Sequence, residues 1–251
     1  MRLLRSLALA FSTYSKIPMP QCAFTEDNLR YSLCFFPAVG ALIGASLLLL
    51  RYAAAALSMG ALLTGALLTI APRLISGGIH MDGFIDAMDA LSSGQPRERK
   101  LEILRDPHVG AFGIMGCAAY LLLMLGVLAE PMAGGTAYVV ALSFVLSRAL
   151  SGLMLLTLKS ARPTGLLATF KGSAQTGAVR LTLALWALLA AALMLLSSPA
   201  RGARALIASA LMLLYYRFMA YRQFGGITGD LAGFFLQICE LAAMAAAVIG
   251  W

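Results

Sequence analysis

Long runs of apolar residues, separated by shorter polar segments, dominate the pattern along this chain. A run of about 20 apolar residues is long enough to cross a lipid bilayer as a helix. Seven runs reach or approach that length, and they cover residues 31–50, 52–72, 109–129, 137–158, 181–196, 205–220 and 231–251. The fifth and sixth are the shortest. The pattern therefore predicts an all-α, polytopic integral membrane protein with about seven transmembrane helices.

Lysine and arginine predict how these helices are oriented. If the N-terminus lies inside and the chain crosses at every run, fifteen Lys and Arg residues fall on the inner side and three on the outer side, with Arg148 inside a run. Positive residues favour the cytoplasmic side of a membrane. The polar segments 74–108, 159–178 and 221–230 all emerge on this side. We therefore expect polar cytoplasmic segments, and any polar substrate is expected to bind there.

The composition agrees with a membrane protein and excludes two other classes. Hydrophobic residues make up 61% of the 251 residues and charged residues 12%, against about 45–50% and about 25% in soluble domains. A disordered or nucleic-acid-binding chain would need more charge. We expect one membrane-embedded catalytic domain over residues 1–251, with an amphipathic cytoplasmic segment at 1–30 that lies on the membrane surface. The four cysteines are scattered singly, so no thiol motif is indicated.

The segment GGIHMDGFIDAMDAL, residues 77–91, concentrates acidic residues in an otherwise apolar chain. Asp82, Asp86 and Asp89 are spaced so that a helix places them within about 60° of one another on one face. Oxygen ligands suit Mg²⁺, which commonly bridges carboxylates and phosphates, so the spacing favours metal-dependent phosphoryl transfer. A solvated polar helix face is the alternative, but apolar residues alternate with the acids. His80 could coordinate, act as acid or base, or cap the segment.

Further polar residues accompany this cluster in the other cytoplasmic segments. Candidate substrate-binding residues are Arg105, Asp106, Arg162, Lys171 and Asp230, the last of which lies in a glycine-rich turn before the final run. Such a turn is weak evidence by itself, because glycine also serves simply to turn the chain.

Two ionisable residues, Arg148 and Glu240, fall within the apolar runs. Charges buried in a membrane are costly, so such residues are functional candidates. Glu240 lies about 15 Å deeper along a helix than Asp230, which argues against a shared metal site. We expect Glu240 to have a structural partner, with Arg148 as the candidate.

The motifs FSTYSKIPMP, FFPAVGALIGA, GGIHMDGFIDAMDAL, RDPHVGAFG and GGITGDLAG occur in order along the chain. Together they resemble the cobalamin synthase family, whose members are adenosylcobinamide-GDP ribazoletransferases of bacterial and archaeal membranes. The resemblance extends from about residue 11 to 240. Ala90 stands where the family usually has glycine, and several apolar positions differ, but the aspartates remain.

The resemblance implies a reaction and a site. The family joins adenosylcobinamide-GDP to α-ribazole or its 5′-phosphate, releases GMP, and requires a divalent cation, normally Mg²⁺. It implies a metal and catalytic site at Asp82, Asp86 and Asp89, with His80 adjacent. We accordingly expect a multi-pass protein of the bacterial cytoplasmic (inner) membrane whose active face is cytoplasmic. The oligomeric state is left open.

Two other functions compete with this interpretation. A CDP-alcohol-type membrane phosphotransferase also places aspartates beside a membrane helix, but its Asp-Gly-x-x-Ala-Arg signature has no full match in MDGFIDAMDAL. A cation transporter would need ionisable residues distributed through its spans. Only Arg148 and Glu240 lie deep in this chain.

Overall fold

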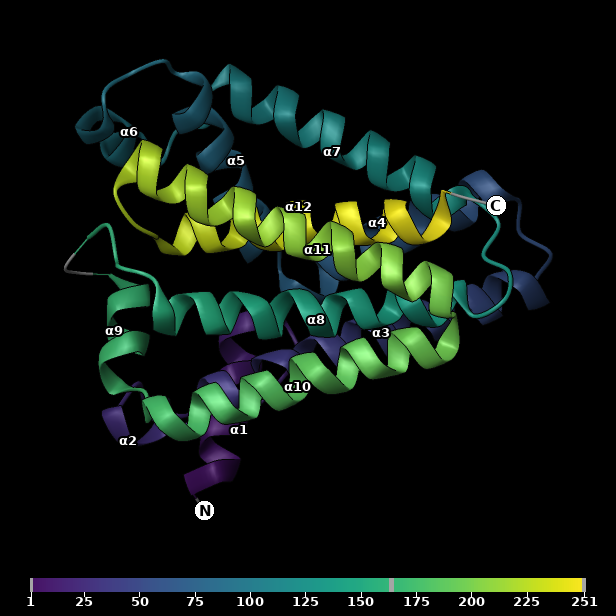
Figure 1. The fold of residues 1–251 in the computed structure, drawn as a ribbon, viewed down its shortest axis with the longest axis horizontal. Helices are drawn as coiled ribbons and strands as arrows, with labels where there is room; N and C mark the ends of the chain where they lie inside the picture. Colours follow the sequence, from purple (N-terminus) through teal and green to yellow (C-terminus); the bar gives the residue numbers. More distant parts are fainter. Residues whose placement is uncertain (1, 163–164, 250–251) are drawn as a thin grey trace.

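The computed structural model describes residues 2–162 and 165–249, and regular structure in these ranges is helical throughout (Figure 1). The long helices are α3 (Phe36–Ala56), α4 (Ala61–Ser76), α7 (Ala111–Ala129), α8 (Thr136–Thr157), α10 (Thr176–Ser197), α11 (Pro199–Met219) and α12 (Gly229–Val248). The shorter elements are α1 (Arg2–Tyr14), α2 (Glu26–Leu29), η1 (Ser32–Phe35), α5 (Ile79–Ser92), α6 (Arg97–Ile103), α9 (Leu166–Ser173) and a π-helical turn, η2 (Ala220–Phe224). The all-α membrane fold expected from the sequence is confirmed.

Six helical segments of the described chain are long and apolar enough to cross a membrane: 26–56, 111–129, 136–157, 176–197, 199–224 and 229–248. The helices α4 and α5 together would make a seventh, but the chain bends by 99° between them. In Figure 1 α5 runs across the direction of the long helices at one end of the bundle. We therefore assign α4 as a short membrane-spanning helix and α5 as a helix that lies outside the membrane-spanning segments.

The second span differs from the sequence prediction. Residues 52–72 were expected to form one helix, but α3 continues through Ala56, the chain turns over residues 57–60, and α4 extends to Ser76. Arg51 consequently lies inside α3. The fifth and sixth spans are longer than expected because α10 begins at Thr176 and α11 at Pro199.

The corner between α4 and α5 is built from two glycines. Gly77 and Gly78 both have left-handed backbone conformations, with φ of 67° and 78°, which glycine adopts without steric cost. A side chain at Gly77 would collide with that of Lys16. The backbone amide of Lys16 donates to the carbonyl of Ile75 at 2.8 Å, which ties the N-terminal segment to this corner.

Helix α8 lies at the centre of the bundle and packs against α3, α10 and α12. Gly40 and Gly44 of α3 face the backbone of α8 with no room for a side chain, as small residues do in closely packed membrane helices. Helices α7, α10 and α11 are much less buried than α8 and expose many leucines. This apolar outer surface is the one expected to face lipid.

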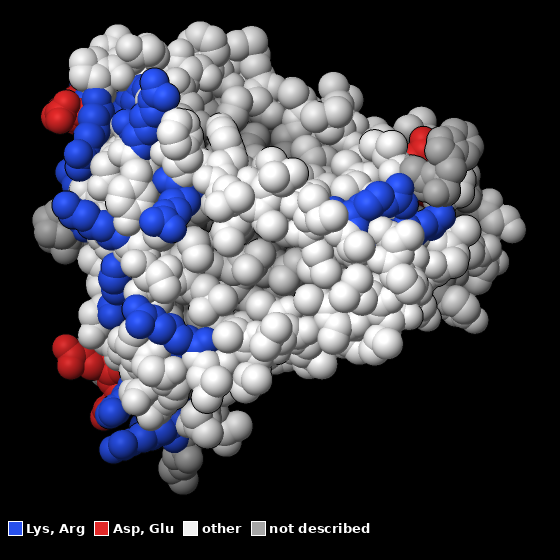
Figure 2. Space-filling model, viewed as in Figure 1, with Lys and Arg blue, Asp and Glu red and all other residues white. Residues whose placement is uncertain are grey.

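The two ends of the bundle differ in charge. On the face drawn in Figure 2, most Lys and Arg side chains gather at one end of the molecule and a smaller group lies at the other. The first end carries α5, α6 and α9 (Figure 1). We call it the polar end, and it holds the three polar segments that the sequence placed together on one side.

Candidate active site

A cavity of about 250 Å³ opens at the polar end. Residues of α1, α3, α5, α8, α9 and α12 line it, together with the turn before α12. Asp82, Gly165 and Gly229 are solvent-exposed and mark its mouth. Among the predicted site residues, it brings together His80, Asp82, Arg162 and Asp230.

Two acidic residues far apart in the sequence meet here because α5 packs closely on α12. A Cβ atom on Gly83 would lie 2.8 Å from the backbone of Asp230, and one on Gly233 would lie 2.9 Å from the carbonyl oxygen of His80. Both glycines therefore allow the two helices to approach backbone to backbone. As a result, the carboxylates of Asp82 and Asp230 border the same cavity.

Asp230 is positioned by the start of α12. Thr228 caps this helix, its hydroxyl oxygen accepting from the amide of Leu231 at 3.2 Å. The Thr228 hydroxyl also donates to Asp230 at 3.4 Å. A carboxylate in the first turn of a helix is stabilised by the positive end of the helix dipole. The opening of α12 therefore holds an anion at the edge of the cavity.

Asp86 lies within electrostatic reach of this pair. Burial, followed by the negative charges of Asp82, Asp230 and Asp89, raises the pKa of Asp86 to about 6. Like charges that crowd in this way favour protonation or a compensating cation. The acidic cluster therefore extends across two helices, rather than lying on α5 alone as the sequence spacing indicated.

Asp89 makes a different set of contacts from the other two aspartates of α5. Its two carboxylate oxygens accept from the backbone amides of Gly110 and Gly113, each at 2.8 Å. These amides open helix α7, and a carboxylate satisfies unpaired donors at a helix N-terminus. Neither glycine has room for a side chain, because a Cβ atom would meet Asp89 itself. Asp89 thus links the N-terminus of α7 to α5 through these two hydrogen bonds.

Arg162 supplies the positive charge of the site. Its guanidinium lies 4.0 Å from the carboxylate of Asp230 and also donates to the carbonyl of Leu101. Burial, with a further contribution from the charge of Arg105, lowers the pKa of Arg162, whereas Asp230 raises it. The side chain stays 15% exposed, so it can reach an anion in the cavity.

The remaining predicted residues lie in other positions. Arg105 and Asp106 are exposed and do not line the cavity, and Asp106 pairs with His108 at 2.8 Å within its own loop. The ammonium of Lys171 donates to the carbonyl of Leu158 at 2.6 Å, outside the cavity lining. His80 does line it, and burial together with the charge of Arg148 lowers the pKa of His80. Its imidazole is therefore neutral.

The donor set fits a hard cation. Asp82 and Asp230 offer carboxylate oxygens at the cavity, and Asp86 lies near them. Among the described residues, no three His, Cys, Asp or Glu side chains are arranged to hold a metal ion together. Mg²⁺ is usually bound by one or two carboxylates and completed by substrate phosphates and water, and this arrangement is compatible with that pattern. The metal roles of Asp82, Asp86 and Asp89 stay predictions.

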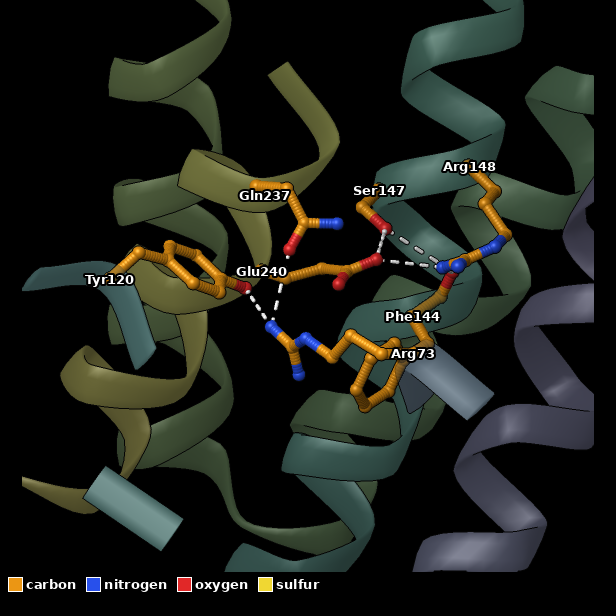
Figure 3. Close-up of polar contacts among 7 residues, drawn as sticks. All are labelled: Arg73, Tyr120, Phe144, Ser147, Arg148, Gln237 and Glu240. Atoms are coloured by element: carbon orange, nitrogen blue, oxygen red, sulfur yellow. Dashed lines mark hydrogen bonds and ion pairs between the residues drawn. The ribbon is translucent and has the colours of Figure 1, made fainter. Parts of the chain in front are cut away.

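A buried polar network lies among α4, α7, α8 and α12 (Figure 3). Arg148 donates to Glu240 at 2.7 Å, with each side chain 3% exposed, and the hydroxyl of Ser147 donates to the same carboxylate oxygen at 3.0 Å. The expected pairing of Arg148 and Glu240 is thus confirmed. Arg73 lies beside the pair and donates to Tyr120 at 2.6 Å and to Gln237 at 3.2 Å.

Sequence reasoning missed the apolar part of the cavity. Tyr14, Phe36 and Phe170 line it from α1, α3 and α9. Nothing in the spacing of these residues connects them, because they come together only when three distant segments pack. Their sole sequence signal is that Tyr14 and Phe36 fall within two of the resemblance motifs.

Comparisons with known proteins place the chain in a family. A family model described as Cobalamin-5-phosphate synthase matches residues 6–248. The chain belongs to this family. It is 45% identical over 249 residues to an adenosylcobinamide-GDP ribazoletransferase of Lachnoclostridium phytofermentans, covering 99% of this chain and 95% of the relative. A second relative of that name, from Desulfitobacterium hafniense, is 34% identical, with 95% and 94% covered. No solved structure matches the chain.

Membership in the cobalamin-5-phosphate synthase family confirms the resemblance drawn from the motifs. A third relative of the same name, from Mesorhizobium japonicum, is 31% identical and covers 99% of this chain. The chain is therefore an enzyme, a membrane transferase of cobalamin biosynthesis.

Proposed function

We propose that this enzyme joins adenosylcobinamide-GDP to α-ribazole or α-ribazole 5′-phosphate, releases GMP, and forms adenosylcobalamin or its 5′-phosphate. The name shared by its relatives supports the substrate pair. The observation that carries the proposal is the cavity at the polar end, where Asp82, Asp230 and Arg162 converge. Transfer of a phosphoryl group from a pyrophosphate to a hydroxyl is favoured by a cationic group near the phosphate oxygens and a carboxylate near the hydroxyl.

The residues of the cavity can be given roles in this transfer. The 3′-hydroxyl oxygen of the ribazole forms a bond to the phosphorus on the corrinoid side, and the bond from that phosphorus to the bridging oxygen breaks, so that GMP leaves. Asp82 is the candidate acceptor for the hydroxyl proton, because it is exposed at the mouth while Asp230 faces Arg162. Arg162 is the candidate clamp for the phosphate oxygens, since a guanidinium binds them in a fork.

Mg²⁺ is part of the proposal, and Asp82 and Asp230 would hold it, with Asp86 close enough to add its charge. When bound, the ion would neutralise charge on the pyrophosphate and on the leaving phosphate. The supporting observation is that burial and then the negative charges of Asp82, Asp230 and Asp89 raise the pKa of Asp86, because a cation would compensate such crowding.

We further propose that the polar end faces the cytoplasm and that the protein resides in the bacterial inner membrane. The support is the excess of Lys and Arg at that end, which favours the cytoplasmic side. Nucleotide-activated substrates are made in the cytoplasm, so this orientation places the mouth of the cavity where they are available.

The proposal is tested with purified enzyme in detergent, given both substrates while GMP release is followed as Mg²⁺ is varied. We expect release that depends on Mg²⁺ and a fall of about 10²–10⁴-fold in Asp82→Asn, the range for loss of an acid–base group. The matched control is Asp27→Asn, an exposed aspartate of α2 at the same end, which should keep full activity. No GMP with any divalent metal would overturn the assignment, and turnover of CDP-lipid instead would favour the alternative phosphotransferase.

A further inference from the structure

The inner wall of the cavity is aromatic, in contrast to its acidic mouth. Tyr14 lies against Phe36 with ring centroids 4.3 Å apart and stacks on His80 at 6.1 Å with the planes 14° apart. Phe170 approaches Tyr14 at 5.9 Å. These four side chains come from α1, α3, α5 and α9 and all line the cavity. We call them the aromatic wall.

Two members of the aromatic wall, Tyr14 and His80, carry polar groups. As whole residues, Tyr14 and His80 are 9% and 6% exposed. Burial alone raises the pKa of Tyr14, and burial with the charge of Arg148 lowers that of His80, so no hydrogen bond to a described residue contributes to either shift. Buried hydroxyl and imidazole groups are nearly always hydrogen-bonded in folded proteins. Both groups line the cavity, so a bound molecule is the natural partner.

The size of the cavity limits what that molecule is. A volume of about 250 Å³ lies just below the range of about 300–1,000 Å³ that holds drug-sized ligands. A nucleoside-sized group fits such a space, whereas a corrinoid macrocycle does not. The corrinoid part of the other substrate must therefore remain outside the mouth.

We propose that the aromatic wall is the subsite for the base of the ribazole substrate, an inference that rests on the proposed function. The base of α-ribazole is a planar, apolar dimethylbenzimidazole, and planar bases stack on aromatic side chains. Its free ring nitrogen only accepts hydrogen bonds, and the hydroxyl of Tyr14 can donate one. With the base against the wall, the ribose points toward the mouth, where Asp82, Asp230 and Arg162 lie.

The same chemistry predicts a preference among bases. An adenine-type base carries an exocyclic amine and three free ring nitrogens, which are more polar groups than Tyr14 and His80 can pair in this wall. A buried donor without a partner costs about 1–3 kcal/mol, which corresponds to about 5- to 150-fold in affinity. We therefore expect the enzyme to favour benzimidazole-type over adenine-type α-ribosides.

Removing one hydroxyl tests the subsite without emptying the wall. In Tyr14→Phe we expect the KM for α-ribazole to rise about 2- to 13-fold, the loss of one hydrogen bond, while the KM for adenosylcobinamide-GDP stays unchanged. The control is Tyr52→Phe, which removes the same group from an exposed tyrosine of α3. Phe170→Leu should raise the KM for α-ribazole about 5- to 150-fold and reduce the preference for benzimidazole-type over adenine-type ribosides.

A binding measurement separates this inference from the proposed reaction. Equilibrium dialysis of labelled α-ribazole against the detergent-purified enzyme needs no second substrate. Binding weakened in Tyr14→Phe but not in Tyr52→Phe supports the subsite, even if no GMP is formed and the proposed reaction fails. Equal binding by wild type and both Tyr14→Phe and Phe170→Leu, or no binding at all, overturns the subsite, whatever the turnover assay shows.

Discussion

Replacing Glu240 by glutamine removes the negative charge from the buried network but nearly preserves its shape. In the native protein, the carboxylate accepts from Arg148 at 2.7 Å and from Ser147 at 3.0 Å, and both ionised side chains are 3% exposed. The substitution therefore leaves the positive charge of Arg148 buried without compensation, next to Arg73.

The expected loss can be bounded from the geometry. At 2.7 Å and an effective dielectric constant of about 20, the attraction between unit charges is about 6 kcal/mol. The cost of taking both charges out of water offsets much of this attraction in the intact pair. Removing one partner of a buried pair costs about 3–5 kcal/mol. For a chain of this length, that corresponds to a fall in Tm of about 6–20 °C.

The assay is thermal unfolding of the detergent-purified variants, with Glu130→Gln, an exposed glutamate at the opposite end of the bundle, as the matched control. The double variant Arg148→Met with Glu240→Leu removes both charges, and we expect it to recover most of the Tm, because no unpaired charge remains. If the two single losses simply add in the double variant, with coupling under about 0.5 kcal/mol, the pair is not the stabilising unit described above.

Three further predictions concern the cluster, its packing and its orientation. Asp89→Ala should lower the Tm substantially, because it leaves two backbone amides of α7 unpaired and each charged hydrogen bond contributes about 1.5–3 kcal/mol to stability. An unchanged Tm with lost activity would instead indicate that Asp89 binds the metal. Gly83→Ala should separate α5 from α12 and lower the activity about 100-fold. The control Gly126→Ala, which has open space at its Cβ position, should leave the activity unchanged. Equal activities in the two variants would refute the close packing of α5 on α12 as a requirement for activity. In a cysteine-free protein in intact cells, Glu130→Cys should react with an impermeant maleimide and Asp27→Cys should not, and the reverse pattern would invert the orientation.

The sequence predicted the membrane fold and the helix of the acidic cluster well, for physical reasons. Transmembrane helices are predominantly apolar over about 20 residues, so the hydropathy pattern locates them, although α4, with 16 residues, does not qualify as a span by itself. The i, i+4, i+7 spacing on α5 is a local property that survives folding. The pairing of Arg148 with Glu240 was also predictable, because two charges deep in apolar runs have few possible partners.

The boundaries of the second span were less predictable. Leu57 and Met59 are apolar, so the turn between α3 and α4 carries almost no polar signal. Ser58, whose φ is 52°, and Gly60 are the few residues there that favour a turn. A turn beside lipid can be as apolar as the helices that it connects, so hydropathy does not show where one helix ends and the next begins.

The tertiary contacts of the site were the least predictable part. Spacing placed Asp82, Asp86 and Asp89 on one face, yet Asp89 is occupied by the start of α7 while Asp230, from α12, joins the cluster. The approach of Asp230 to the cluster depends on Gly83, and the lack of a side chain there is informative only once the neighbouring helix is known. Single-sequence patterns carry no such information.

The crossing helix α5 explains how an enzyme embedded in lipid can bind a polar pyrophosphate and an apolar base in the same cavity. Because the chain turns by 99° at Gly77 and Gly78, the acids of α5 lie across the end of the bundle instead of inside the bilayer, where ionised carboxylates would be costly. The same turn brings His80 against the aromatic side chains of α1 and α3. One short helix therefore contributes both to the acidic mouth of the cavity and to its aromatic wall. Straightening it, for example with Gly78→Val, should abolish nucleotide transfer and ribazole binding together, whereas Gly172→Val, at a site on α9 with open space around the Cβ position, should spare both.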